Sequence, residues 1–414
     1  MKVQIHRGTQ EIGGTCVEIE SQGARIVLDV GLPLHVADAD WPLLPPVRGF
    51  AHPDPALLGV VISHAHLDHY GLAHRLPPKT PFLIGQASEN ILRAAALFSP
   101  TGLGLGCTTH LEDRIPMQLG PFTITPFLVD HSAYDAYAIL VQADGQALFY
   151  TGDLRAHGRK GALFEKLLRL PPAPVDVLLM EGTTIGRSDA EKGFATEAKL
   201  EDGMVEVFKQ TTGMALVWCS GQNIDRLVTV YKACQRAGRE FIIDMYTAEI
   251  LRATGNANVP QADWEFIKVF LPQSQKRQIK VAGAFDVAAR YRNKRIFPES
   301  LAAAAAKSVM MFRPSMMDDL EDAKCLGGAG LVYSMWSGYL WDEKKRRLLE
   351  WLEHHDIALV ECHTSGHAAV KDLQRLRQCF GNAPVVPIHT EHADRFVELF
   401  GNVQFRKDGQ WWNV

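Results

Sequence analysis

The sequence lacks a long apolar run, and its cysteines are few and scattered. No stretch approaches the ~18–20 apolar residues that span a bilayer, and no apolar segment of the kind found in secretory signals follows the first residues. The seven cysteines are odd in number and include no Cys-x-x-Cys pair, which argues against a cysteine zinc knuckle and for reduced thiols. We therefore expect a cytoplasmic protein that makes no membrane contact.

A strong excess of charge of one sign is missing as well. The formal net charge of the 414 residues is −4, so the chain is no bulk polycation and any contact with nucleic acid must come from a local patch. Hydrophobic residues make up 47% and charged residues 22%, as in ordinary globular proteins. The length allows two or three domains, and we find neither an internal repeat nor a low-complexity linker.

Four potential metal ligands stand within six positions, namely His64, His66, Asp68 and His69. They follow the apolar run 58–62, which indicates a buried strand that delivers polar side chains to its C-terminal end. Because strand side chains alternate, His64 and His66 leave on one side, and after a turn Asp68 and His69 can face a second position nearby. Imidazole and carboxylate suit zinc and its first-row neighbours. The alternative is a pair of core histidines beside a helix-capping aspartate.

Other predicted strands of the first 182 residues also end in histidine or in an acid. These ends are Leu28-Asp29, Val129-Asp130-His131, Thr151-Gly152-Asp153 and Met180-Glu181, and the same pattern returns at Ile388-His389. Packing alone explains such a series poorly. Any one of these side chains could be an ordinary hydrogen-bonded polar group, but several strands end in the same way. The series indicates that one rim of a sheet collects ligands.

The chain changes character twice. After residue 184 strands alternate with helices, which is typical of a parallel, doubly wound unit. From residue 357 the earlier pattern of strand, polar tip and helix returns. We therefore predict one domain made of residues 1–184 and 357–414, interrupted by a second domain at 185–356.

These residues resemble the metal sites of the metallo-β-lactamase superfamily. The resemblance implies an αββα sandwich with two Zn²⁺ ions, or Mn²⁺ as an alternative. It assigns His64, His66 and His131 to the first metal, Asp68, His69 and His389 to the second, Asp153 to a bridge between them, and Asp29 to the support of the ligands. Two such ions about 3.5–4 Å apart lower the pKa of a water and stabilise charge in a phosphoryl displacement.

Glu181, His367 and His389 further resemble motifs A, B and C of the β-CASP nucleases, the branch that includes ribonuclease J and the endonuclease of mRNA 3′-end cleavage. The resemblance makes the inserted residues 185–356 a parallel α/β β-CASP cap domain, so the fold class is α/β. It also implies that Glu181 orients His367, that His367 contacts the scissile phosphate or protonates the leaving oxygen, and that Asp68 is catalytic. A carboxylate beside imidazole raises its basicity and fixes its tautomer. A histidine at position 367 favours the RNA-processing members.

Two turns are candidates for binding phosphate. One precedes His367, and the other resembles the family's strand-to-helix turn, where backbone N–H groups at a helix start attract anions. The candidate residues are Ser365 and Gly366 in the first turn and Ser220, Asn223 and Arg226 in the second. A simple helix cap for the first turn and a solvated arginine at Arg226 are the alternatives.

A basic run lies in residues 272–308, which we expect to be helical. Seven cations stand in twenty residues, namely Lys276, Arg277, Lys280, Arg290, Arg292, Lys294 and Arg295. They form either a solvated helix face or a wall that contacts an RNA backbone.

The expected function is that of a zinc-dependent ribonuclease. It would hydrolyse RNA phosphodiester bonds by dizinc-activated water in a cleft between the domains, as an endonuclease, a 5′-to-3′ exonuclease or both. The partner would be single-stranded RNA, and a homodimer stays open. The alternatives are a hydrolase of the same fold that acts on DNA or on a small phosphoester or ester, and a non-catalytic RNA-binding scaffold. The sequence stops soon after Trp412, so we expect it to lack the extra C-terminal domain of full-length ribonuclease J.

Overall fold

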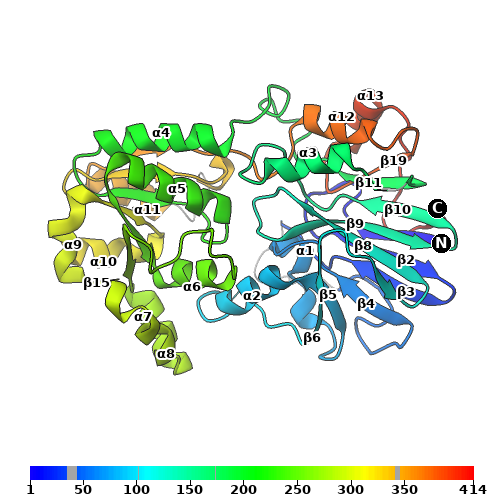
Figure 1. The fold of residues 1–414 in the computed structure, drawn as a ribbon, viewed down its shortest axis with the longest axis horizontal. Helices are drawn as coiled ribbons and strands as arrows, with labels where there is room; N and C mark the ends of the chain where they lie inside the picture. Colours follow the sequence, from blue (N-terminus) through cyan, green and yellow to red (C-terminus); the bar gives the residue numbers. More distant parts are fainter. Residues whose placement is uncertain (35–43, 101, 173, 341–345) are drawn as a thin grey trace. The chain divides into compact units, whose positions relative to one another are not determined.

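The computed structural model describes residues 1–34, 44–100, 102–172, 174–340 and 346–414, and its contacts divide the chain into two compact units (Figure 1). Unit 1 comprises Met1–Arg93, Leu103–Phe194 and Gly366–Val414, and unit 2 comprises Ala94–Gly102 and Ala195–Ser365. The division therefore falls after residues 194 and 365, whereas the domain bounds expected from the sequence, at 185 and 356, stay a prediction. None of the described helices is both long and apolar enough to cross a bilayer.

Unit 1 contains two sheets. The first is seven-stranded, in the order β20-β1-β2-β3-β4-β5-β6, and the second is six-stranded, in the order β19-β11-β10-β9-β8-β7. The strands of the first sheet are β1 (Lys2–Arg7), β2 (Cys16–Ser21), β3 (Ala24–Leu28), β4 (Leu57–Val61), β5 (Pro81–Gly85), β6 (Cys107–Leu111) and β20 (Trp411–Asn413). Those of the second are β7 (Met117–Leu119), β8 (Phe122–Val129), β9 (Ala136–Ala143), β10 (Gln146–Tyr150), β11 (Val177–Glu181) and β19 (Val385–Ile388).

Apolar layers pack the two sheets together and cover their outer faces. Strand β11 is buried along its whole length, and its alternation serves both layers: Leu179 joins the cluster shared by the two sheets, while Leu178 and Met180 pack with Phe164 behind the second sheet. A further cluster joins the first sheet to Leu92. The helices of unit 1 are α1 (Leu67–Tyr70), α2 (Gln86–Ala95), α3 (Gly161–Arg169), α12 (Val370–Gln378) and α13 (Phe396–Phe400). The layers run helix, sheet, sheet, helix, as predicted.

Unit 2 is built on a parallel sheet of seven strands in the order β15-β14-β13-β16-β12-β17-β18. Its strands are β12 (Ala215–Trp218), β13 (Glu240–Asp244), β14 (Ile267–Phe270), β15 (Arg295–Ile296), β16 (Ser308–Met311), β17 (Gly330–Tyr333) and β18 (Ala358–Glu361). Its helices are α4 (Glu197–Gln210), α5 (Ile224–Ala237), α6 (Met245–Ala253), α7 (Gln273–Ala282), α8 (Phe285–Arg290), α9 (Pro298–Ala304), α10 (Met317–Asp322) and α11 (Arg346–His354). The predicted fold class, a sandwich with an inserted parallel α/β unit, is confirmed.

The expectation that residues 272–308 are helical throughout is wrong in one part. Helices α7, α8 and α9 occupy most of this segment, but β15 intervenes and pairs with β14 at Val269 and Phe270. A strand of two residues is too short to leave an alternating pattern in the sequence.

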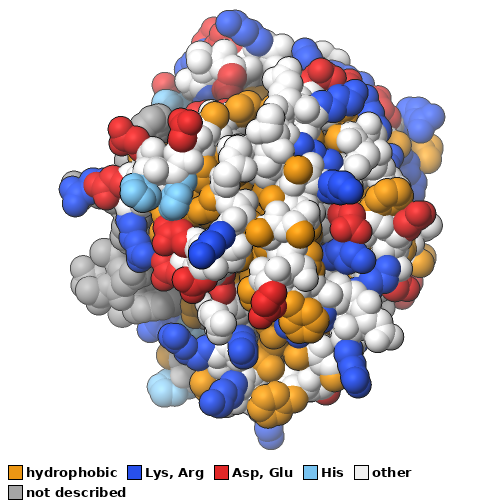
Figure 2. Space-filling model, turned by 90° about the vertical axis from the view of Figure 1, so that its left-hand side faces the viewer, with side chains coloured by type: hydrophobic (Ala, Val, Ile, Leu, Met, Phe, Trp, Pro, Cys, Tyr) orange, Lys and Arg blue, Asp and Glu red, His pale blue; other side chains and the backbone are white. Residues whose placement is uncertain are grey.

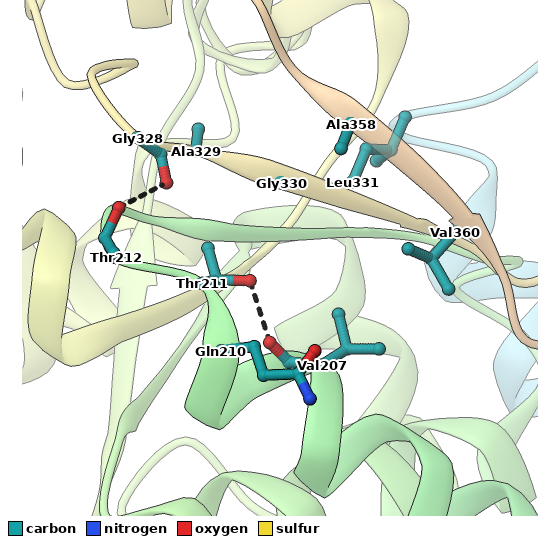
Figure 3. Close-up of a pocket in the computed structure, with 10 residues that line it drawn as sticks. All are labelled: Val207, Gln210, Thr211, Thr212, Gly328, Ala329, Gly330, Leu331, Ala358 and Val360. Atoms are coloured by element: carbon teal, nitrogen blue, oxygen red, sulfur yellow. Dashed lines mark hydrogen bonds between the residues drawn. The ribbon is translucent and has the colours of Figure 1, made fainter.

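A pocket of about 270 Å³ lies in unit 2 between the end of α4 and strands β17 and β18 (Figure 3). Its lining contains no acid, histidine or cysteine. The two threonines at its rim use their hydroxyls on the backbone, since Thr211 Oγ1 donates to Val207 O and Thr212 Oγ1 to Gly328 O. These ten lining residues therefore supply no group for metal binding or proton transfer.

Helices α4 and α5 are joined by a buried ion pair. The side chain of Arg226 is fully buried, and its Nε and Nη2 donate to the two oxygens of Glu197, each over 3.1 Å. Nη1 donates to Ser334 O at 3.0 Å. A bidentate pair of this kind fixes both orientation and distance.

Replacing Arg226 with methionine should lower the free energy of unfolding by about 3–5 kcal/mol, because the Glu197 carboxylate would then be buried without its partner. Urea-induced unfolding followed by circular dichroism measures the change. The matched control is Arg236→Met on the same helix, since Arg236 is 48% exposed and pairs with Glu201 and Asp202; its loss should matter little. Equal effects of the two substitutions would contradict the structural role of the Arg226 pair.

Candidate metal centre

The candidate ligands of unit 1 stand at one rim of the sandwich because parallel strands end there together. In the first sheet β3 runs parallel to β4, so Asp29 ends near the loop 62–66. In the second sheet β10, β11 and β19 are parallel, and β8 has the same direction because β9 is antiparallel to both β8 and β10. The side chains that follow these strands are His131 after β8, Asp153 after β10, Glu181 at the end of β11 and His389 after β19.

The structure brings these side chains into three groups, in each of which the potential ligand atoms lie within 4.8 Å of one another. The groups are His64, His66 and His131; Asp68, His69, Asp153 and His389; and Asp153, Glu181 and His367. Asp153 belongs to two of them. All seven metal ligands expected from the sequence therefore lie in this centre, together with the expected pair Glu181 and His367.

The contacts within the centre fit a set of cation ligands. His66 Nδ1 lies 3.1 Å from His131 Nε2, and His389 Nε2 lies 3.2 Å from Asp68 Oδ2. Within the described part of the chain, His64 Nε2 and Asp153 Oδ1 are buried and have no hydrogen-bond partner. Buried polar atoms are nearly always bonded, so converging orphan atoms of this kind suit a divalent metal ion.

The ionisation of His64, His66, His131 and Asp153 favours the same interpretation. Burial and the neighbouring imidazoles hold the pKa values of His64 and His131 well below the usual range, and burial lowers the pKa of His66 to about 4. Burial raises the pKa of the Asp153 carboxyl, but His389 and His69 outweigh burial and hold that pKa well below its usual range. Neutral imidazole and ionised carboxylate are the forms that bind metals.

Asp29 orients His69. Asp29 is fully buried at the end of β3, with a left-handed backbone (φ +60°) that aspartate and asparagine tolerate. Its Oδ2 lies 2.7 Å from His69 Nδ1 and accepts from Tyr150 OH at 2.7 Å, while Oδ1 accepts from Ser63 N at 2.7 Å. Because Asp29 engages Nδ1, the opposite nitrogen of His69 faces Asp153 at 3.1 Å. Burial lowers the pKa of His69, but Asp153 and Asp29 outweigh burial and raise it.

Glu181 and His367 form a pair beside Asp153. His367 Nδ1 lies 3.1 Å from Glu181 Oε2 and 3.6 Å from Asp153 Oδ2. Glu181 is buried and also accepts from Leu154 N at 2.8 Å, so its carboxylate is held in place. Burial lowers the pKa of His367, but Glu181 and Asp153 outweigh burial and raise it. The His367 side chain is 19% exposed, which leaves an edge of the ring within reach of a substrate.

Sequence reasoning missed three hydroxyl side chains that support the centre, those of Ser63, Tyr150 and Thr183. Ser63 Oγ and Tyr150 OH both donate to Asp29 Oδ2. Thr183 Oγ1 lies 2.8 Å from His389 Nδ1 and so directs Nε2 of that ring toward Asp68. The only signal for Thr183 was its position two residues after Glu181. Hydroxyl side chains are satisfied in so many surroundings that this signal was too weak.

The residues expected to bind phosphate lie in different surroundings in the structure. Gly366 is required for close packing, since a Cβ there would lie 2.5 Å from Ser132 Oγ; Ser365 is buried. In unit 2, Ser220 Oγ accepts from Gln222 N, and Asn223 Oδ1 caps α5 by accepting from Arg226 N at 3.1 Å. These unit 2 residues are not members of the metal-ligand groups.

The expectation that Arg226 faces phosphate is wrong. Its guanidinium is buried and pairs with Glu197, as described above. The sequence could not reveal this pairing because Glu197 lies on a separate helix.

Residues 24–219 match the family model of the beta-lactamase superfamily domain. This match covers just under half of the chain, and the resemblance to the superfamily that the motifs indicated is confirmed.

Curated relatives are named ribonuclease J. The chain is 27% identical over 243 residues to ribonuclease J of Helicobacter pylori (strain ATCC 700392 / 26695), a match that covers 57% of this chain and 34% of that protein. It is 24% identical over 254 residues to ribonuclease J of Mycolicibacterium smegmatis, with 58% and 43% covered. An RNase J-like protein of Methanocaldococcus jannaschii is 25% identical over 221 residues, with 50% and 48% covered. Each match thus spans less than half of the relative.

The fold also occurs in a crystal structure of a protein of unknown function from Enterococcus faecalis V583. The TM-score is 0.80 at 20% sequence identity, and the superposition covers 100% of this chain and 99% of that one. The shared architecture therefore extends over unit 2 as well as unit 1.

Replacing Asp29 with asparagine should lower the affinity for a divalent metal about 10–100-fold. Asparagine tolerates the left-handed backbone, so the substitution removes the charge that orients His69 without adding strain. Competition with a chromophoric chelator measures the affinity. Tyr150→Phe is the control, since it removes one donor to Asp29 but leaves the carboxylate. Unchanged affinity in Asp29→Asn would show that the orientation of His69 does not depend on this contact.

Proposed function

We propose that the protein is a metal-dependent ribonuclease that hydrolyses the phosphodiester bonds of single-stranded RNA with two Zn²⁺ ions, for which Mn²⁺ can substitute. The observation that carries the proposal is the Glu181–His367 pair beside Asp153, a carboxylate that also belongs to the four-residue ligand group. The similarity to proteins named ribonuclease J supports RNA as the substrate. A cytoplasmic location and a homodimer remain predictions from the sequence.

The residues divide between two ion positions. His64, His66 and His131 would hold one ion, Asp68, His69 and His389 the other, and Asp153 would lie between them. When bound, such ions lower the pKa of a water and neutralise charge on the phosphoryl oxygens. Asp29 and Thr183 bond to Nδ1 of His69 and His389, which would leave Nε2 of each ring to hold an ion.

His367 supplies the proton in the proposed reaction. Water adds to phosphorus and loses a proton to solvent, the bond from phosphorus to the 3′ oxygen breaks, and the leaving oxygen takes a proton from His367, which gives a 3′-hydroxyl and a 5′-phosphate. His367 then regains a proton from solvent. Glu181 holds Nδ1, so the transferred proton comes from Nε2. The neighbouring carboxylates raise the pKa of His367 against the effect of burial, which favours the protonated ring that a general acid requires.

The first test compares 5′-labelled RNA and DNA of matched sequence with Zn²⁺ or Mn²⁺. RNA should be degraded, and EDTA should stop the reaction. Asp68→Ala/His69→Ala should lose activity and should also lose bound metal, which elemental mass spectrometry measures. Mononucleotide release would indicate exonuclease action, and internal fragments endonuclease action. Equal RNA decay by the double variant would remove the mechanism, and preference for DNA would favour the deoxyribonuclease alternative.

His367→Ala should lower kcat about 10²–10⁴-fold while the bound metal is retained, as expected for a general acid. His110→Ala is the control, because His110 of β6 pairs with Glu89 of α2 and belongs to none of the ligand groups. Unchanged turnover in His367→Ala would make that histidine a structural residue. Loss of metal together with turnover would make it a ligand.

A further inference from the structure

Helices α7 and α8 of unit 2 and the residues directly after them concentrate positive charge outside the metal centre. Residues 273–297 contain seven cations and one acid, Asp286, which gives a formal charge of +6 in a chain whose net charge is −4. Lys276, Arg277, Lys280 and Arg292 are exposed. In the described part of the chain, none of these four side chains takes part in a salt bridge or hydrogen bond.

Their neighbours are tied into the fold, so the segment is held firmly. Arg290 and Tyr291 both bond to Glu249 of α6. Gln275 Nε2 donates to Asp244 Oδ2 at 2.6 Å, and Gln278 Nε2 donates to Phe98 O at 2.9 Å. The exposed cations therefore belong to a segment whose backbone is already fixed, so less conformational entropy is lost when a ligand binds.

Exposed apolar side chains occur in the same segment of the chain as these cations. Val281 is 85% exposed and Phe285 is 62% exposed, and they lie at the end of α7 and the start of α8. Figure 2 shows lysine and arginine side chains beside hydrophobic ones on the lower part of the face that it draws. An exposed aromatic ring within a field of cations is a feature of single-strand binding, because the ring stacks on a base while the cations contact phosphates.

We propose that the α7–α8 surface, defined as Lys276, Arg277, Lys280, Phe285 and Arg292, binds single-stranded RNA without sequence preference. The proposal rests on the proposed function only in taking RNA as the ligand. The charge of the segment complements a polyanion. An anionic membrane is a poorer fit, since a membrane-surface helix needs a continuous apolar face, whereas α7 turns Ile279 inward and exposes Val281 alone among its large apolar residues.

The test measures binding of a phosphorothioate-linked oligoribonucleotide, which resists cleavage and keeps the backbone charge. Affinity is determined by fluorescence anisotropy over a series of salt concentrations. Lys276→Gln/Arg277→Gln/Lys280→Gln should weaken binding and reduce the slope of log K against log salt by about 2. Each side chain that no longer neutralises a phosphate of a single strand lowers this slope by about 0.7.

The matched control is Lys209→Gln/Lys232→Gln/Lys324→Gln. These lysines are also exposed in unit 2, and the control changes the net charge by the same amount. Its slope should stay close to that of the unaltered protein. Equal reductions in the two triple variants would overturn the proposal, because a general charge effect would then explain the binding.

Phe285 separates stacking from simple hydrophobic contact. Phe285→Leu should weaken RNA binding about 5- to 150-fold and Phe285→Tyr should leave it nearly unchanged, because only the tyrosine keeps a ring for the base. Equal affinities of the two variants would overturn the stacking role. Sedimentation with phosphatidylglycerol vesicles is the last arm: vesicle binding that the α7–α8 triple variant abolishes, with an unchanged RNA slope, would assign the surface to membranes instead.

These results are independent of the metal centre because no cleavage is measured. If the unaltered protein cleaves RNA and the triple variant keeps its salt slope, the α7–α8 surface proposal fails and the proposed function stands. If the slope falls but no RNA is cleaved, the ribonuclease function fails and the surface stands.

Discussion

The candidate centre depends on one buried carboxylate, that of Asp153. An ionised carboxylate inside a protein is costly unless positive or polar partners surround it, and here four imidazoles lie within 3.7 Å of its oxygens, namely those of His64, His69, His367 and His389. The backbone before it turns through Gly152, where φ is +52° and a Cβ would lie 3.0 Å from Tyr137 O. Because Gly152 has no side chain, the chain can turn close to the sheet at this point. The negative charge of Asp153 then attracts the surrounding imidazole rings.

Parallel strand ends explain how residues so distant in the sequence reach this carboxylate. Each strand direction fixes which rim receives its last side chain, so β8, β10, β11 and β19 deliver theirs to one place. Hydroxyl and carboxylate groups behind the ligands then fix ring orientations, as Asp29 does for His69 and Thr183 for His389. The strand directions and these supporting groups together determine which nitrogen of each ring faces the centre.

Much of this could be predicted from the sequence, because the informative residues stand at the ends of apolar strands. The six-residue segment from His64 to His69 identifies itself by spacing alone, and the alternation of strands and helices after residue 184 indicated the parallel unit. Tertiary partners set the limit. Arg226 looked available because its partner Glu197 lies 29 residues away on another helix, and β15 escaped notice because two residues carry no periodicity.

The place at which unit 2 interrupts unit 1 has a consequence for synthesis. Glu181 and His367 are 186 positions apart yet in contact, His389 follows later still, and β20 pairs with β1, so the last residues close the sheet that the first ones open. A chain that stops within unit 2 already carries six of the seven expected metal ligands but lacks His367 and His389, so premature termination yields products with no complete centre.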